Sequence, residues 1–353
     1  MRITEILTKA TESKASDIFI IAGAPVTIKC RQKLVRLSDE ILKPVAIDEL
    51  VSELYIRTTT RKFEGRDDDF VMIDSVLHRR FRVNVYHQRG SIAIVIRLIE
   101  FDRLQSIPAE SLCIGSEILN LADRRNGGLI LISGPPCCGK TTTAAYMIDK
   151  ISHESQYHII TIEDPIEYLH KHSKSLVSQR ELSIDIKTYS DAMHAAVRES
   201  PDVIFIGEIR DKDSLTSALN AADTGVLVIS TVHAQSGIDT VSRVLDMFHG
   251  NEQSGIRLQI ARVLRAIVSQ QLVETELNEH GFVPIFEILV ANTAVKTLIR
   301  NNNLAQLSWV LKSGKSYGMI SYEESLSKAL TSGLITRETY DKYCSMRIIG
   351  KVG

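Results

Sequence analysis

One segment, 134–141, constrains the fold of this chain more than any other. It reads Gly-Pro-Pro-Cys-Cys-Gly-Lys-Thr and fits the pattern GxxxxGK[ST]. A strand-like apolar run, 129–133, precedes it, and a helix-like stretch, 142–151, follows it. In this context the backbone N–H groups at the start of the helix surround phosphate oxygens. The segment therefore predicts a phosphate-binding loop in an α/β fold. The alternative, a glycine turn that binds nothing, does not need these flanking elements.

The side chains of this loop predict ATP and Mg²⁺ as its ligands. Lys140 would neutralise the β- and γ-phosphate oxygens, and the hydroxyl of Thr141 would bind the magnesium ion. The predicted ATP-binding residues are Gly134, Pro135, Pro136, Cys137, Cys138, Gly139, Lys140, Thr141 and Thr142.

From residue 127 onward, apolar strands alternate with helices, which indicates a parallel sheet with crossover helices. After residue 235 the pattern becomes mostly helical, and we expect a helical subdomain from about residue 250. The predicted strands are 129–132, 158–162, 203–206 and 226–231. The apolar residues on one face of the predicted helix are Ile256, Ile260, Val263, Leu264 and Ile267.

The first hundred residues have a different pattern, with short strands and few helices. Turn-forming residues at 22–25 and 87–90 each separate two strands and so predict two hairpins. Helical spacing covers 47–56. The predicted strands are 17–21, 26–30, 80–86 and 91–98. This pattern is typical of a small α+β module.

A chain of 353 residues is long enough for about two domains, each with its own core. The pattern breaks at 101–108, and a helix is predicted over 112–122. We therefore expect an N-terminal α+β domain over 1–100, a linker at 101–110 and the ATPase domain over 111–353.

Composition narrows the possible partners and the compartment. Lys and Arg number 42 and Asp and Glu 43, so the net charge of −1 supplies no field that would recruit nucleic acid. The longest apolar runs are strand-sized, which predicts no transmembrane segment. The N-terminus lacks the pattern of a signal peptide, and five cysteines without CxxC pairs fit reduced thiols. We expect a cytoplasmic protein without structural zinc.

Carboxylates follow two of the predicted strands. Glu163, Asp164 and Glu167 come after 158–162, at the edge where α/β sheets bind ligands. Glu163 could polarise the attacking water, while Asp164 or Glu167 could hold the water shell of the metal; a solvated acidic turn is the alternative. Glu208 follows 203–206 in the form of a Walker B segment and would face the magnesium directly or through water.

A histidine follows the fourth predicted strand. His233 comes directly after the run 226–231 and could hydrogen-bond the γ-phosphate and report its presence. A structural histidine with satisfied hydrogen bonds is the alternative.

Taken in order, these segments resemble the secretion and type IV pilus ATPases, the GspE/PilT superfamily of hexameric motors. The acidic stretch 163–167 is similar to that family's Asp box, Glu208 to its Walker B glutamate and 230–233 to its His box. The resemblance covers about residues 2 to 340. It implies a RecA-like P-loop NTPase domain with a parallel-rich sheet, preceded by a PAS-like α+β domain.

Within this family the chain looks most similar to the PilT-like pilus retraction ATPases, through 81–86, 179–182 and 197–204. The resemblance implies an ATP-hydrolysing homohexamer that draws pilin subunits back into the membrane. Such a motor would sit at the cytoplasmic side of an inner-membrane platform protein, with a possible second motor ATPase. The implied catalytic residues are Lys140, Glu163, Glu208 and His233.

The resemblance further implies arginines that act in trans, from the N-terminal domain of a neighbouring subunit. Arg82 and Arg97, on the two strands of the second predicted hairpin, are the candidates. Cations supplied in this way stabilise charge that develops on the γ-phosphoryl group. Ordinary surface charge on a sheet is the alternative.

Two departures from the family pattern leave other functions open. Cys137 stands where the family usually has glycine, and 294–301 reads Ala-Val-Lys-Thr-Leu-Ile-Arg-Asn in place of the motif of retraction enzymes. The alternatives are an accessory PilU-like or weakly hydrolysing regulatory subunit, or a pilus assembly or secretion ATPase. A nucleic-acid motor on the same core is disfavoured by the net charge.

The two cysteines of the loop lead to two predictions, one on backbone strain and one on thiol pKa values. If the loop backbone takes a positive φ at Cys137, a residue with a Cβ is strained there; with a negative φ, cysteine is tolerated. The position of Cys137 and Cys138 beside Lys140 and a helix N-terminus predicts lowered thiol pKa values.

Overall fold

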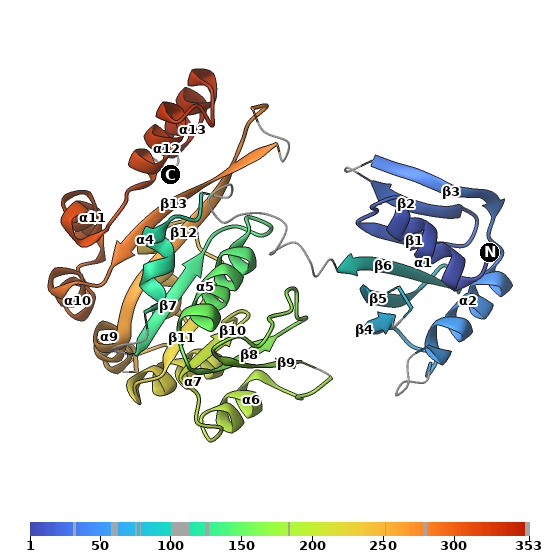
Figure 1. Cartoon of the computed structure of the whole chain (residues 1–353), viewed down its shortest axis with the longest axis horizontal. Helices are drawn as coiled ribbons and strands as arrows, with labels where there is room; N and C mark the ends of the chain where they lie inside the picture. Colours follow the sequence, from blue (N-terminus) through green and yellow to red (C-terminus); the bar gives the residue numbers. More distant parts are fainter. Residues whose placement is uncertain are drawn as a thin grey trace. The chain divides into compact units, whose positions relative to one another are not determined.

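The computed structural model describes residues 1–30, 33–57, 63–74, 76–77, 79–99, 113–123, 127–182, 184–250, 252–277 and 281–349. The chain divides into two compact units, Met1–Arg103 and Leu104–Gly353, each with its own sheet (Figure 1). The predicted linker, 101–110, lies outside the described residues. In the described part of the chain, no helix combines the length and apolar character needed to cross a bilayer.

The described strands of the N-terminal unit form an antiparallel sheet in the order β3-β2-β1-β6-β5-β4. The strands are β1 (Asp17–Ile20), β2 (Pro25–Cys30), β3 (Lys33–Ile41), β4 (Asp68–Asp74), β5 (Arg79–Gln88) and β6 (Ser91–Ile99), with helices α1 (Ile3–Glu12) and α2 (Pro44–Ile56). Both predicted hairpins form. The second has a tighter turn than predicted, because β5 continues to Gln88. Arg89 and Gly90 alone turn the chain, with φ values of 47° and 77°.

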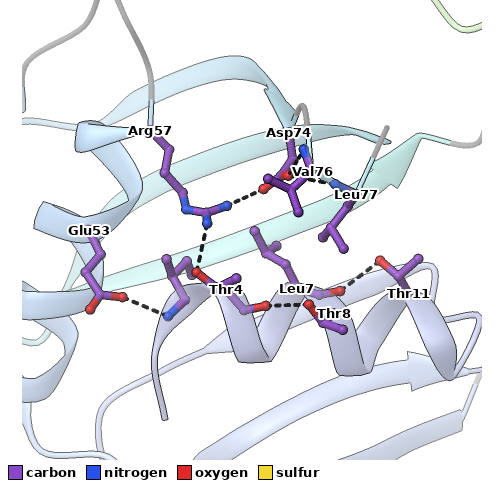
Figure 2. Close-up of polar contacts among 10 residues, drawn as sticks. Thr4, Leu7, Thr8, Thr11, Glu53, Arg57, Asp74, Val76 and Leu77 are labelled. Atoms are coloured by element: carbon purple, nitrogen blue, oxygen red, sulfur yellow. Dashed lines mark hydrogen bonds and ion pairs between the residues drawn. The ribbon is translucent and has the colours of Figure 1, made fainter.

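The two helices of this unit are held to the sheet by a shared apolar core and by an ion pair with the buried Asp74 carboxylate. Ile6 and Leu7 of α1 and Leu54 of α2 are fully buried. At the end of α2, the Arg57 guanidinium pairs with the Asp74 carboxylate at the end of β4, and it also donates to the Thr4 hydroxyl at 2.8 Å (Figure 2). One cation therefore joins α1, α2 and β4.

The second unit contains a mixed, mostly parallel sheet whose described strands run in the order β13-β12-β7-β11-β10-β8-β9. Every neighbouring pair is parallel except β12 and β13. The strands are β7 (Gly128–Ser133), β8 (His158–Glu163), β9 (Leu176–Glu181), β10 (Val203–Ile206), β11 (Leu227–Val232), β12 (Leu264–Glu274) and β13 (Phe282–Val290).

Helices cover both faces of this sheet, because successive strand residues point to opposite sides. Leu129 and Leu131 of β7 pack with the cluster that includes α6, α7, α8 and α9, whereas Ile130 and Ile132 pack with α5 (Figure 1). The helices are α4 (Ser116–Leu119), α5 (Lys140–Glu154), α6 (Tyr189–Ala196), α7 (Lys212–Asp223), α8 (Gly237–Asp246), α9 (Glu252–Val263), α10 (Thr293–Arg300), α11 (Leu307–Ser313), α12 (Tyr322–Thr331) and α13 (Arg337–Ile349).

The predicted helical subdomain from about residue 250 is wrong for 264–290. Within this range β12 and β13 extend the main sheet, whereas α9 before them and the elements after them are helical. The predicted apolar helix face is divided between two elements: Ile260 and Val263 belong to α9, whereas Leu264 and Ile267 belong to β12. Apolar residues three and four apart on both sides of the boundary satisfy the spacing of one helix, so spacing alone does not separate the end of α9 from the start of β12.

The helix predicted over 112–122 is also shorter than expected. Its described part contains α4 and a 3₁₀ turn over Asn120–Ala122, and Cys113 has a φ of 55°, which an α-helix does not contain.

The buried Asp74 carboxylate yields a stability prediction for the N-terminal unit. It pairs with Arg57 and accepts the backbone N–H groups of Val76 and Leu77 at 3.0 and 2.9 Å (Figure 2). We expect Asp74→Asn to lower the free energy of opening of α1 and β4 by about 2 kcal/mol, because it leaves the guanidinium without its counter-charge.

Hydrogen-exchange mass spectrometry of the full chain measures this change in the amides of α1 and β4. Glu64→Gln is the matched control, since it removes an exposed partner of Arg66, and a change below about 0.5 kcal/mol is expected. Equal loss of protection in the two variants would contradict the role of the buried pair.

Candidate active site

Four neighbouring parallel strands end at one edge of the main sheet, and each is followed by a predicted site residue. The loop 134–139 follows β7, His233 follows β11, Glu208 comes two residues after β10, and Glu163 is the last residue of β8. Because the strands are parallel and adjacent, their carboxyl ends lie side by side. The sheet therefore brings residues from four separate segments into one site.

The phosphate loop is shaped by two glycines and by one side chain from β12. A Cβ at Gly134 would come within 2.3 Å of the Gln270 carbonyl oxygen, and one at Gly139 within 2.9 Å of the Gln270 amide nitrogen. The Gln270 side chain itself donates to the Cys138 carbonyl oxygen at 2.5 Å and accepts from the Thr143 hydroxyl at 2.7 Å. Gln270 thus ties the loop to the first turn of α5.

Helix α5 begins at Lys140, and Gly139 before it has no side chain that could cap the helix. The first backbone N–H groups of a helix have no partner within the helix. Those of Lys140, Thr141 and Thr142 are therefore available to phosphate oxygens, together with the positive end of the helix dipole. Of the other predicted loop residues, Pro135, Pro136 and Cys137 are exposed, and Cys138 is buried.

Lys140, His233 and Glu208 form one chain of polar contacts. The Lys140 ammonium donates to the carbonyl oxygens of Gly134 and Pro135 at 3.0 and 2.9 Å and lies 3.3 Å from His233 Nδ1. His233 Nε2 lies 3.1 Å from Glu208 Oε1. Because an ammonium can only donate, Nδ1 accepts and Nε2 carries the hydrogen that Glu208 receives. The imidazole therefore links the loop lysine to the Walker B carboxylate.

Glu163 is the most deeply buried carboxylate of the site, with 3% of its surface exposed. Its Oε1 accepts hydrogen bonds from the Thr161 hydroxyl at 2.7 Å and from the Gln179 amide at 3.3 Å. Desolvation outweighs these bonds and raises the pKa of Glu163 to about 7. A carboxylate with this pKa can accept a proton near neutral pH, which is the property required of a general base.

Two carboxylates of the acidic segment after β8, Glu167 and Asp164, lie in different surroundings. The Glu167 carboxylate accepts from the Thr141 hydroxyl, and burial raises its pKa above the ordinary value although that bond and the Lys140 charge oppose the rise. The negative charge of Asp164 instead contributes to the raised pKa values of Tyr189 and Arg210. Glu167 thus lies at the loop, beside the predicted magnesium ligand Thr141.

The donors at this edge fit a magnesium ion. The part of the chain that is described contains no group of three His, Cys, Asp or Glu side chains suited to a metal. Mg²⁺ commonly takes one or two carboxylates and completes its shell with waters and substrate phosphates. The Thr141 hydroxyl and the Glu167 carboxylate, both oxygen donors beside the phosphate loop, match that requirement.

The two loop cysteines differ from each other. Cys137 has a φ of 60°, so the backbone conformation that favours glycine is present at this position. Cys138 is buried, and desolvation raises the pKa of its thiol. The predicted lowering of that pKa is wrong, because burial outweighs the attraction of Lys140.

Three residues that hold the site in place escape sequence reasoning. Gln179 on β9 donates to the Tyr168 carbonyl oxygen and accepts from the His170 N–H, both at 2.8 Å, in addition to its bond with Glu163. The Tyr168 hydroxyl bonds the Thr142 hydroxyl at 2.7 Å. With Gln270, these residues clamp the acidic segment and the loop. Gln179 falls within the segment 179–182 that resembles the retraction ATPases, whereas no local pattern marks Tyr168 or Gln270.

Arg82 and Arg97 lie opposite each other on the paired strands β5 and β6 of the N-terminal unit. Arg82 pairs with Asp69 at 2.7 Å, and Arg97 pairs with Asp17 at 2.9 Å. Both side chains are substantially exposed, at 41% and 67%. Each arginine is thus paired with one carboxylate on the face of this sheet.

Comparison with known proteins agrees with this arrangement. The profile of the family described as "Type II/IV secretion system protein" matches residues 1–315. The "Type IV pilus retractation ATPase PilT" of Pseudomonas aeruginosa is 34% identical over 96% of each chain. The "Type IV pilus ATPase PilU" of the same organism is 30% identical over 100% of this chain and 92% of its own.

A solved structure gives the same result for the fold. The "Crystal Structure of the Pilus Retraction Motor PilT and Bound ADP" superimposes with a TM-score of 0.83, at 37% identity and over 96% of each chain. That structure contains bound ADP. Because the family profile, the sequence identity and the fold all match over most of the chain, the chain belongs to the type II/IV secretion system protein family, among the PilT-like pilus ATPases.

Proposed function

We propose that this protein is an ATP-hydrolysing motor that powers type IV pilus retraction, and with it twitching motility and pilus disassembly. The single observation that carries the proposal is the chain Lys140–His233–Glu208 beside the buried Glu163, in a protein similar over nearly its whole length to a pilus retraction ATPase. This set of groups is suited to phosphoryl transfer to water.

Each side chain has a definite task in this reaction. Lys140 exchanges its carbonyl contacts for the β- and γ-phosphate oxygens of ATP. Glu163 takes the proton of the attacking water into a site whose low polarity already favours its protonated form. Mg²⁺, when bound, would neutralise phosphate charge, with Thr141, Glu208, Asp164 and Glu167 as the candidate ligands.

His233 is placed to report the state of the nucleotide. Its two ring nitrogens join Lys140 to Glu208, so a γ-phosphate that draws the lysine forward breaks the 3.3 Å contact with Nδ1. A change in the loop is thereby transmitted to the Walker B segment.

The working assembly is proposed to be a homohexamer on the inner-membrane platform protein of the pilus, at the cytoplasmic face of the membrane, with a second motor ATPase as a possible partner. In such a ring, Arg82 and Arg97 of one subunit would approach the nucleotide of the next. Their exposure and their position on neighbouring strands support this role.

A second candidate function has one specific observation in its favour. Cys137 occupies a left-handed backbone position in the phosphate loop, which costs a residue with a Cβ roughly 1 to 2 kcal/mol. A loop strained in this way suits an accessory, weakly hydrolysing subunit, and the similarity to the PilU ATPase is compatible with it.

The purified protein tests the proposed reaction. We expect Glu163→Gln to keep nucleotide binding and lose at least about 100-fold in turnover, because the shape remains and the base is gone. Wild-type turnover should rise with pH through about 7 as Glu163 loses its proton. Coupled-enzyme assays measure turnover, and a fluorescent ATP analogue measures binding.

Two further variants control this measurement. Lys140→Ala should lose binding as well as turnover, and Glu154→Gln, an exposed change at the end of α5, should leave both unchanged. Wild-type turnover in Glu163→Gln would show that another group is the base.

Cells that carry Glu163→Gln test the direction of force. Retraction needs hydrolysis and extension does not depend on this motor, so we expect surface pili in normal or excess number together with loss of twitching. Electron microscopy counts the pili, and a surface-spreading assay measures twitching. Cells without pili would mark the protein as an extension motor instead.

Cys137 yields a prediction that separates the two candidate functions. Cys137→Gly should tighten ATP binding or raise turnover by up to about tenfold, because relief of 1.4 kcal/mol of strain is about one factor of ten. Measurements under reducing conditions exclude oxidation of the thiol. Cys137→Ala is the matched control, since it removes the thiol but keeps the Cβ, and it should behave as wild type. Equal ATP affinity and equal turnover in wild type, Cys137→Gly and Cys137→Ala would show that backbone strain at Cys137 does not limit the reaction.

A further inference from the structure

A second polar pocket lies at the other end of the strands that carry the phosphate loop. It has a volume of about 420 Å³ and includes Gly128, the first residue of β7, whereas the loop follows Ser133 at the opposite end. At about 3.3 Å per residue, the two sites are roughly 15 Å apart along the strand. The pocket is therefore separate from the nucleotide site.

Cations predominate in the lining of this pocket. Arg262, Arg265 and Lys296 line it together with a single carboxylate, Asp223, so the formal charge of the lining is 3 − 1 = +2. Asp223 is already engaged by Arg262, whose Nε donates to Oδ1 at 2.6 Å. The lining thus retains two positive charges in excess of its own carboxylate.

The other two cations are oriented by groups that do not neutralise them. Arg265 donates to the carbonyl oxygens of Asp123 and Gly127, and Lys296 donates to the carbonyl oxygen of Arg262 at 3.2 Å. A carbonyl oxygen carries no net charge. Burial lowers the pKa of Arg265, although the Asp123 carboxylate, which is not among the pocket lining, opposes that change.

The backbone fixes Arg265 in this position. Gly128 has a φ of 103°, and a Cβ there would come within 2.8 Å of Arg265 Cγ and 2.6 Å of the Val263 carbonyl oxygen. The arginine stem therefore lies directly against the glycine, and its guanidinium is held before any ligand arrives. Such preorganisation lowers the entropic cost of binding an anion.

We propose that this pocket binds a doubly charged tetrahedral oxyanion, namely a phosphoryl group. Its charge would balance the +2 of the lining, and guanidinium groups present N–H donors in the geometry that phosphate oxygens accept. The volume is typical of a small-molecule site and exceeds the need of a bare ion. The phosphoryl group can come from inorganic phosphate or from a phosphorylated small molecule. This inference does not depend on the proposed motor function.

Calorimetric titration of the full-length protein tests the proposal. Inorganic phosphate and, separately, glycerol 3-phosphate are added to protein saturated with ADP, with sodium chloride at equal ionic strength as the reference. The titration is repeated with Lys140→Ala, in which the nucleotide loop is impaired. We expect one saturable anion site per chain under both conditions. The tighter of the two ligands identifies the source of the phosphoryl group.

Three variants assign the anion to this pocket. Lys296→Met, which keeps the length of the side chain and removes its charge, should weaken binding by about tenfold. Asp223→Asn should tighten it severalfold, a gain that misfolding cannot produce. Lys187→Met, an exposed change outside the pocket, is the matched control and should have no effect.

The proposal is overturned by any of three results. These are the absence of saturable binding, equal affinity in wild type and Lys296→Met, and binding that disappears in Lys140→Ala, which would place the anion in the nucleotide loop.

Discussion

The parallel register of β7, β11, β10 and β8 is the constraint on which the rest of the site depends. Ser133 of β7 pairs with Val232 of β11, and Ile206 of β10 pairs with both Ser230 and Ile162. The residues that follow these strands therefore emerge at one edge. A slip of one residue would move a strand end by about 3.3 Å and turn its apolar side chains to the wrong face. Contacts of 3.1 to 3.3 Å around His233 would not survive such a slip.

Burial of this edge gives its ionisable groups their properties. The same desolvation raises the pKa of Glu163 to about 7 and lowers the pKa of Lys140 from its ordinary value. Each shift favours the uncharged form of its group relative to the same group in water. Carbonyl oxygens of the loop hold the lysine. The nearby Glu208 and Glu167 carboxylates partly oppose the shift of Lys140, and the phosphates of a nucleotide would add further negative charge beside it.

Local patterns could predict much of this arrangement. Each predicted site segment follows a short apolar run, which is typical of a central strand. These segments are the loop 134–141, the acids after β8 and β10, and the histidine after β11. The strands 264–274 and 282–290 could not be predicted, because Val263, Leu264 and Ile267 satisfy the spacing of a helix although they lie across the boundary between α9 and β12. The roles of Gln179 and Gln270 could not be predicted from local sequence for another reason. Each role depends on a hydrogen bond to a residue distant in the sequence: Gln179 bonds Glu163, 16 residues away, and Gln270 bonds Cys138, 132 residues away.

The amino-acid sequence by itself determined which chemistry is present: a lysine and a hydroxyl after a glycine loop, carboxylates at strand ends, and a cysteine where the backbone favours glycine. Tertiary structure alone decided how these groups behave. It set the burial that raises the thiol pKa of Cys138, the hydrogen bonds that hold Glu163, and the excess of cations around Gly128. The physical reason is that residue identity follows the chain, whereas desolvation and charge balance depend on neighbours that the sheet brings together from distant segments.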